Sequence, residues 1–469
     1  MGAVEAPPPA APEATPAVQP QPNPSGQGAP RGPDDRREVP EYDGREEPTS
    51  AGDVLVWVPR VVLFPLYVVS EYVLRRPLGW LVSTAEREHW PALIIDFFTF
   101  GEERQGGIVP TFLIDFGMRP SIGVYAFWND FIVTGNDLRF RAAYGGERLY
   151  QLRAVDRFAL GAGIFSMLGG FESRPDNVFY GLGRDASDER SRYYARTSRA
   201  ELAYQMPWVR SSRARVGVEL RQVDLDGDRR CCDAPSVDDQ VAAGVFDAPP
   251  GMNQVFDVAS QSLELVLDNR YPRFPEELEL ASDYVTPPGN GARLALRGRV
   301  SELMDQSLAP DRALADGWVH YGASLGGYYD ASGEQRSLSA TAIVDFVDPV
   351  GSGEVPITDL ISLGGERPLR GFLANRFVDR SAAALRLEYR WPIAVWLDGS
   401  LTYEAGSVFG RHLSGFDLGD MRSSFGFGLA AVGAQDHPFQ VLVALGTESY
   451  ADGANVDSFR FVFGTTAGF

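Results

Sequence analysis

Strict alternation of apolar and charged residues is the feature that most constrains this chain. Between residues 213 and 221, alanine, valine and leucine occupy the even positions, while arginine, glutamate and glycine occupy the odd ones. The same period of two recurs at 138–144, 292–300 and 383–391. Successive side chains of a β-strand point to opposite faces. Each segment is therefore predicted to be a strand with one apolar face and one charged face.

Alternation alone is compatible with two architectures. A soluble sandwich buries its apolar face, whereas a membrane barrel turns that face to lipid and lines its lumen with charge. An even number of strands of about ten residues favours the barrel. We count sixteen candidate strands: 109–117, 121–129, 135–145, 148–156, 158–170, 190–206, 211–223, 256–268, 292–303, 317–329, 337–346, 382–391, 396–406, 422–432, 438–448 and 457–469.

Two further features favour the barrel. Short links such as 118–120, 146–147 and 207–210 occur with long polar ones such as 224–255 and 347–381, and we expect the two kinds at opposite ends. The last candidate strand is similar to the C-terminal assembly signal of bacterial outer-membrane proteins. Its aromatic residues fall on one face, and the chain ends in the last of them: Phe459, Phe461, Phe463 and Phe469. We therefore predict an all-β fold, a sixteen-stranded antiparallel transmembrane β-barrel over residues 107–469.

The residues before the barrel differ in composition. Twelve of the 33 prolines fall within the first 48 residues, so residues 1–52 are predicted to be a disordered Pro/Ala-rich tail. Residues 1–20 lack the basic start and apolar run of a secretory signal, so we expect any signal to have been removed or to lie upstream. Residues 53–106 are apolar and predicted to be helical. Their longest uncharged stretch, ten residues, is too short to span about 30 Å of hydrocarbon. A helix at the membrane interface and a helix packed on a soluble core both remain open.

Charge excludes one class of partner. Lys and Arg number 43 against 63 Asp and Glu, a formal net charge of −20, which argues against a nucleic-acid-binding protein. The predicted partner is instead the lipid bilayer of the bacterial outer membrane.

One loop carries a family resemblance. It contains the glycine pair Gly364-Gly365 and the motif Leu369-Arg370-Gly371-Phe372, and Glu404-Ala405-Gly406 follows in a later strand. This combination resembles the outer-membrane assembly and transporter superfamily of BamA/TamA-type insertases and two-partner-secretion transporters, also called the bacterial surface antigen family. The resemblance implies sixteen strands and a loop folded into the lumen before strand twelve. Only about 106 residues precede the predicted barrel, so we expect a short member that lacks POTRA domains.

The motif also has a physical interpretation. An arginine in the lumen needs a partner, because unpaired buried charge is costly. We expect Arg370 to pair with Glu404 and to fix the loop inside the barrel, with Glu404 and Gly406 as the loop-pairing position on the barrel wall. Glycines such as Gly371 let the loop backbone approach that wall. A solvated surface loop is the alternative.

Signals for enzymatic or metal chemistry are weak. Gly322-Ala323-Ser324-Leu325-Gly326 matches the pentapeptide of serine hydrolases, but a nucleophile elbow needs a strand, a sharp turn and a helix, and no helix is predicted after it. The acidic run 224–228 lacks the complete twelve-residue calcium loop. Cys231 and Cys232 are predicted to form a vicinal disulfide, with two free or intermolecularly paired thiols as the alternative. We expect no enzyme, metal or cofactor.

Three functions remain open. The resemblance implies insertion or translocation of unfolded outer-membrane or secreted proteins, through a weak seam between the first and last strands that can template an incoming strand. The barrel is alternatively a passive pore plugged by its loop, or a structural or adhesive surface protein.

Overall fold

The computed structural model describes the barrel and little of what precedes it. It covers residues 84, 96–101, 104–183, 186–228, 231–232, 234–270, 289–307, 313–330, 336–394, 397–431 and 439–465. The tail predicted over 1–52 and nearly all of the segment predicted to be helical over 53–106 lie outside these residues. Both therefore stay predictions.

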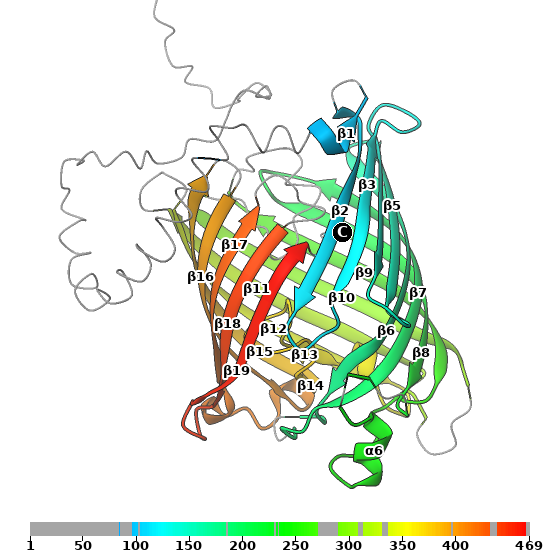
Figure 1. Ribbon diagram of the computed structural model, residues 1–469, viewed down its shortest axis with the longest axis vertical. Coiled ribbons are helices and arrows are strands. Elements are labelled where there is room, and N and C mark those ends of the chain that lie inside the picture. Colours follow the sequence, from blue (N-terminus) through cyan, green and yellow to red (C-terminus); the bar gives the residue numbers. More distant parts are fainter. Residues whose placement is uncertain are drawn as a thin grey trace, which may run out of the picture. The chain divides into compact units, whose positions relative to one another are not determined.

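The described residues form a closed antiparallel barrel, and the sixteen-stranded fold class is confirmed (Figure 1). Each strand pairs with its neighbours in chain order, and the last pairs with the first. The sixteen strands are β2 (Gly106–Asp115), β3 (Ser121–Asn129), β4 (Asn136–Tyr144), β5 (Tyr150–Leu160), β6 (Gly163–Phe179), β7 (Ser191–Pro207), β8 (Arg213–Asp226), β9 (Val255–Asp268), β10 (Gly291–Gln306), β11 (Gly317–Asp330), β12 (Ser337–Val350), β15 (Ser381–Ala394), β16 (Leu397–Phe409), β17 (Arg422–Ala431), β18 (Phe439–Ser449) and β19 (Val456–Thr465). A two-residue strand, β1 (Thr99–Phe100), adds to β2.

Exposure shows which face of the strands meets lipid. On β8, Val216, Val218 and Leu220 are each at least half exposed, whereas Arg213 and Glu219 are nearly buried. The same division holds on β15, where Leu385 and Leu387 face outward and Glu388 is 8% exposed. Apolar side chains therefore cover the outside and charges line the lumen, as in a membrane barrel rather than a sandwich.

One predicted hairpin was misplaced. The sequence suggested a turn at residue 157, but β5 runs on to Leu160 and the chain turns at Gly161 and Ala162. β6 then continues to Phe179, nine residues beyond its predicted end at 170. A register shift between Arg174 and Asn177 explains the missed extension, because a bulge interrupts the alternation.

The expected separation of short and long connections holds only in part. Strands alternate in direction, so all links that follow odd-numbered barrel strands lie at one end. The short links 118–120 and 146–147 follow the first and third strands, and they share this end with the long connections 224–255 and 347–381. The 22-residue connection between Asp268 and Gly291 belongs to the opposite end.

The strands differ in length around the barrel. The six strands around the first–last contact, β17–β19 and β2–β4, have 9 to 11 residues. On the far wall, β6 and β7 have 17 residues each and β10 has 16. Among the described residues, the strands beside the first–last contact are therefore shorter than β6, β7 and β10.

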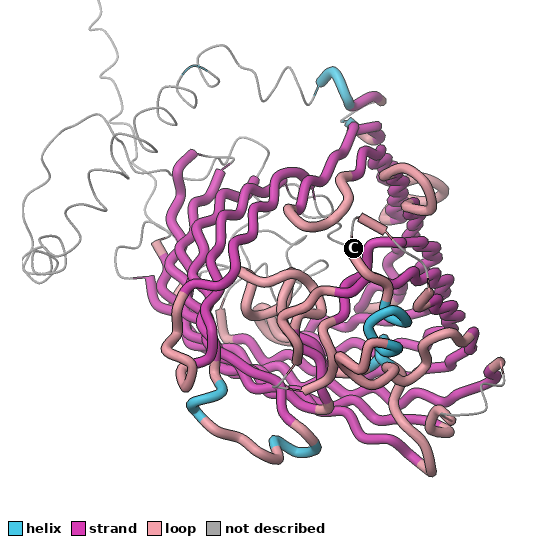
Figure 2. Tube along the Cα trace, turned by 60° about the horizontal axis from the view of Figure 1, so that its bottom comes forward, coloured by secondary structure: helices cyan, strands magenta, loops and turns pink. Residues whose placement is uncertain are grey.

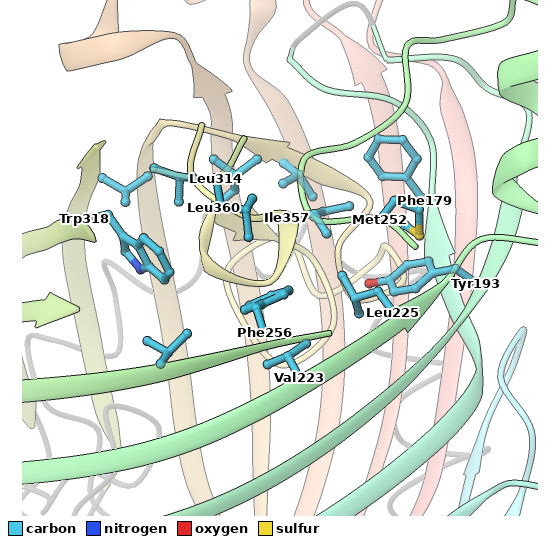
Figure 3. Packing of buried hydrophobic residues seen from close by; sticks show 14 of the residues in the cluster. Phe179, Tyr193, Val223, Leu225, Met252, Phe256, Leu314, Trp318, Ile357 and Leu360 are labelled. Carbon is cyan, nitrogen blue, oxygen red and sulfur yellow. The ribbon is translucent and has the colours of Figure 1, made fainter. Parts of the chain in front are cut away.

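The connection between β12 and β15 folds into the barrel. It contains η3 (Ile357–Asp359) and a small hairpin, β13 (Ile361–Leu363) with β14 (Phe377–Asp379). Figure 2 shows loops crossing the interior of the ring of strands at this end. Ile357 and Leu360 pack with buried residues of the surrounding strands and loops, among them Phe256 and Trp318 (Figure 3). This apolar cluster packs the loop against the surrounding barrel wall.

Short helices complete the described part of the chain. They are α6 (Val237–Ala242), which begins with a capping box at Ser236, η4 (Arg411–Leu413) and η5 (Leu418–Asp420). No helix that the structure describes has the length and apolar character needed to cross a membrane.

Candidate functional site

The loop motif lies in a tight backbone turn at the barrel wall. Gly364 and Gly365 have φ values of 102° and 72°, in the region that favours glycine. A Cβ at Gly364 would lie 2.2 Å from the carbonyl oxygen of Leu373, so no larger residue fits there. Leu369 also has a positive φ of 71°, which costs a non-glycine residue about 1–2 kcal/mol. Its side chain is fully buried beside Phe372, and this packing offsets the strain.

The structure places Arg370 of the loop beside Glu404 of β16. The Arg370 backbone N–H donates to Glu404 Oε2 at 2.7 Å, and its Nε donates to Oε1 at 3.1 Å. The Glu404 side chain is 1% exposed and that of Arg370 is 16% exposed. Two hydrogen bonds to one buried carboxylate fix both the backbone and the side chain of the loop.

A line of alternating charges continues from this pair along the wall. Arg386 on β15 lies opposite Glu404 in the register, with its Nε 3.7 Å from Oε1. Arg386 also bonds Glu388 at 2.5 Å, and Arg390 bonds Glu388 at 2.7 Å. Sequence reasoning did not identify this network, although the run of charges on the predicted inner face of 383–391 was its signal. Glu404 is therefore shared by arginines from the loop and from the wall.

A second ion pair holds the start of the loop. Arg221 on β8 donates to both oxygens of Asp359 in η3, at 2.7 and 2.8 Å. Burial alone would raise the pKa of Asp359, but the neighbouring Arg221 guanidinium holds that pKa below its ordinary value. The ring of His320 contacts the Asp359 carbonyl from β11. Sequence reasoning missed this anchor, because nothing local relates residues 138 positions apart.

Gly371 lies against the backbone of the wall. Its N–H donates to Ser424 Oγ on β17 at 2.7 Å, and its carbonyl accepts from Ser458 Oγ on β19 at 2.8 Å. A Cβ at Gly371 would lie 2.4 Å from the Leu445 carbonyl group of β18. The Phe372 ring covers Gly446, the next residue of that strand. The motif thus touches three neighbouring strands through backbone and small side chains.

We expect Gly371→Ala to detach the loop from β18. The added methyl would overlap backbone, which cannot move aside as a side chain can, so the loop must shift and lose its bond to Ser424. Overpacking of this kind costs about 1–3 kcal/mol. Urea unfolding in detergent and trypsin cleavage of the loop would measure the loss. Gly298→Ala on β10 is the matched control, because a Cβ there meets nothing within 4 Å; equal behaviour of the two variants would contradict the prediction.

The first–last contact is the weakest in the described barrel. β19 and β2 pair through three residue pairs, Val462–Asp115, Phe463–Ile114 and Gly464–Leu113. Every other contact between neighbouring barrel strands has eight pairs or more. One further backbone bond, from Phe116 N–H to the Phe461 carbonyl, extends the contact. We call this contact the seam.

Arg460 joins the seam to the loop. Its Nε and Nη2 donate to the two oxygens of Asp115 across the seam, at 2.9 and 2.8 Å. Its Nη1 donates to the carbonyls of Gly365 at 2.5 Å and Arg370 at 3.3 Å. Sequence reasoning missed this residue, although a single arginine between Phe459 and Phe461 was a visible signal. One buried guanidinium therefore holds first strand, last strand and motif together.

Aromatic rings cover the lipid side of the same seam. Phe116, just beyond β2, packs on Phe461 at 5.0 Å between ring centroids, and Phe112 of β2 packs on Phe463 at 5.2 Å. Phe459 is 54% exposed on the same outward face. Phe469, also part of the predicted C-terminal assembly signal, lies outside the described residues. Whether these phenylalanines act as an assembly signal stays a prediction.

Gly406 lies two residues beyond Glu404 on β16. A Cβ there would come within 3.0 Å of the Ala384 side chain on β15, so a small residue is favoured at this place. Gly406 thus contacts the neighbouring strand of the wall, whereas Glu404 binds the loop.

The comparison with known families decides what kind of barrel this is. A model of the Omp85 superfamily domain matches residues 131–467, most of the chain. The chain belongs to the Omp85 superfamily. The resemblance inferred from the loop motif is confirmed, and this Omp85 barrel is an integral protein of the bacterial outer membrane. The described residues contain no POTRA domain.

Three solved structures are similar to this chain at low identity and with TM-scores below 0.5. BamA from Haemophilus ducreyi lacking POTRA domains 1–3 is 15% identical, with a TM-score of 0.49 over 77% of this chain and 70% of that one. CdiB from Escherichia coli is 11% identical, with a TM-score of 0.48 over 76% and 62%. CdiB from Acinetobacter baumannii is 10% identical, with a TM-score of 0.46 over 77% and 59%. The Omp85 chain thus spans less than two thirds of either CdiB chain. No curated protein matches its sequence.

The remaining sequence motifs have structural roles in the described chain. The pentapeptide around Ser324 lies inside β11, and the next element that the structure describes is the strand β12. A Cβ at Gly322 would overlap Asp345 of β12. The glycine therefore makes room across the strands. Cys231 and Cys232 are joined by a disulfide. The described residues hold no group of three or more His, Cys, Asp or Glu side chains suited to a metal ion. The acidic run 224–228 belongs to these residues and forms no such group.

Proposed function

We propose that this Omp85 barrel assists the insertion or translocation of proteins at the outer membrane by opening its seam. The observation that carries the proposal is the pairing of β19 with β2 through three residue pairs, whereas the other neighbouring barrel strands form at least eight pairs each among the residues that the structure describes. Unpaired backbone groups on a strand edge accept another strand. A client strand would add to β2 or β19 once the two separate.

The loop motif supports the same proposal. Arg370 and Gly371 bind β16, β17 and β19, and Arg460 links them to Asp115 of β2. In our proposal the docked loop keeps the seam closed until a client competes for its edge. The hydrogen bonds of the seam would be replaced by hydrogen bonds to the client strand. This exchange requires no covalent chemistry and no cofactor.

Cross-linking the seam tests the proposal. Ile114→Cys with Phe463→Cys places cysteines at directly opposed residues, within reach of a disulfide. Both native cysteines are replaced by serine in every variant. We expect reduced protein in proteoliposomes to accelerate insertion of a urea-unfolded eight-stranded outer-membrane barrel, and the oxidised form to return the rate to that of empty liposomes. A reductant should restore the acceleration.

The matched control is a cross-link between well-paired strands. Val124→Cys with Ala142→Cys joins β3 to β4 at opposed outward residues, and its oxidation should leave insertion unchanged. An oxidised seam pair that still accelerates insertion would overturn the proposal. A stable conductance that grows when the loop is deleted, without any effect on insertion, would establish the passive pore instead.

A further inference from the structure

The lumen holds a cavity that the seam and the loop motif do not use. It has a volume of about 540 Å³ and lies between the inner faces of β8–β12 and β15 and loop residues 358–368. Seven arginines and four carboxylates line it. The lining therefore carries excess positive charge in a chain whose overall charge is −20.

The four carboxylates already have arginine partners. Asp345 lies 3.2 Å from Arg297 and Asp359 lies 2.7 Å from Arg221. The other two, Glu264 and Glu388, lie 3.6 Å from Arg213 and 2.5 Å from Arg386. Among the other lining arginines, Arg215 has Glu201 of β7 as its partner, a carboxylate that does not itself line the cavity.

Two arginines carry much of the excess. Arg299 on β10 approaches a carboxylate only at 4.0 Å, at Glu219, and its side chain is 38% exposed to the lumen. Arg367 is exposed in the loop, and within the described chain its hydrogen bonds go to Ser362 Oγ at 3.0 Å and to the Ser362 carbonyl at 3.4 Å. These guanidinium groups keep donors for another acceptor.

A buried hydroxyl points to the same conclusion. Ser324 on β11 lines the cavity, is 4% exposed, and its Oγ has no hydrogen-bond partner among the described residues. Leaving a buried hydroxyl without a hydrogen-bond partner is unfavourable, so such groups are normally satisfied. Thr358 also lines the cavity, but its hydroxyl already donates to Asp359 Oδ2 at 2.9 Å. Arginine forks together with the free Ser324 hydroxyl suit an acceptor with several charged oxygens.

We propose that this cavity binds a polyvalent oxyanion of the phosphate type, free in solution, through Arg299, Arg367 and Ser324. The bound anion would bridge loop and wall, because Arg367 belongs to the first and Arg299 to the second. The cavity lies on the inward face of the strands, away from lipid, which favours a soluble anion over a lipid headgroup. The inference is independent of how the seam functions.

Calorimetric titration of the full-length protein in detergent with sodium pyrophosphate, at constant ionic strength, tests the site. We expect saturable binding that weakens about tenfold or more in Arg299→Gln/Arg367→Gln, because the double variant loses both charged donors. Arg148→Gln, on an exposed arginine outside the cavity, should bind as the unmodified protein does. Heat-modifiable migration on gels reports whether each variant is folded. Binding that does not saturate, or that persists in the double variant, would overturn the proposal.

A second measurement uses the unmodified protein. Phenylglyoxal modifies accessible arginines, and mass spectrometry identifies them. Pyrophosphate should protect Arg299 and Arg367 and leave Arg148 reactive. Equal reactivity of all three with and without pyrophosphate would overturn the site. Protection by dihexanoyl phosphatidate but not by pyrophosphate would also overturn it, by identifying a lipid headgroup as the ligand.

Discussion

Reversing the charge of Arg370 should release the loop from the barrel wall. In Arg370→Glu the buried carboxylate of Glu404 loses its loop partner and faces a like charge. Removing one partner of a buried pair costs about 3–5 kcal/mol. Arg386, 3.7 Å from Glu404, will retain part of the compensation, so we expect the lower end of that range. Urea unfolding measures the change, and trypsin cleavage after the loop arginines reports release directly.

Variants of Glu404 distinguish loss of the Arg370–Glu404 ion pair from general destabilisation of the barrel. Glu404→Arg alone should be as harmful, because it places a third arginine beside Arg370 and Arg386. The double variant Arg370→Glu/Glu404→Arg should recover part of the loss, since opposite charges again face each other. A double variant no better than either single variant would refute the pairing of Arg370 with Glu404.

Replacing Arg460 should loosen seam and loop together. Arg460→Gln leaves Asp115 without its bidentate partner and removes donors from the carbonyls of Gly365 and Arg370. Truncating such a buried hydrogen-bonded pair costs about 2–5 kcal/mol. We expect slower disulfide formation between Ile114→Cys and Phe463→Cys, and faster trypsin cleavage of the loop, in the same variant.

Two comparisons make this prediction specific. Arg460→Lys keeps the charge but not the planar fork, so it should recover only part of the effect. Arg196→Gln removes another cross-strand pair, Arg196 with Asp224, from the well-paired contact of β7 and β8, and should change neither readout. A change in cross-linking without a change in loop cleavage would show that Arg460 does not connect the two.

The sequence predicted the barrel well because its main signal is local. Lipid outside and water inside impose alternation on every strand, so all sixteen strands could be placed from neighbouring residues. Errors occurred where local rules conflict. The boundary between two candidate strands was set at residue 157, but the chain turns at Gly161 and Ala162, and the bulge after Arg174 hid the end of β6.

The site was less accessible to sequence reasoning. Arg370 and Glu404 stood out through a motif, and the structure places them in contact. Arg460 and Asp115 lie 345 positions apart and meet only because the sheet closes on itself. No local sequence pattern shows which strands meet when the barrel closes. Contacts across the seam, and contacts between the loop and the opposite wall, could therefore be found only from the three-dimensional structure.

The uneven wall has a consequence for the surrounding bilayer. A ten-residue strand tilted by about 45° rises roughly 23 Å, whereas a seventeen-residue strand rises roughly 40 Å. The apolar band of an outer-membrane barrel is about 25 Å tall, close to the first height and well below the second. A strand of the height of β2 therefore barely covers that band, whereas β6 and β7 extend beyond it. Among the described residues, the contact with the fewest strand–strand pairs thus includes a strand with little height to spare against the apolar layer of the membrane.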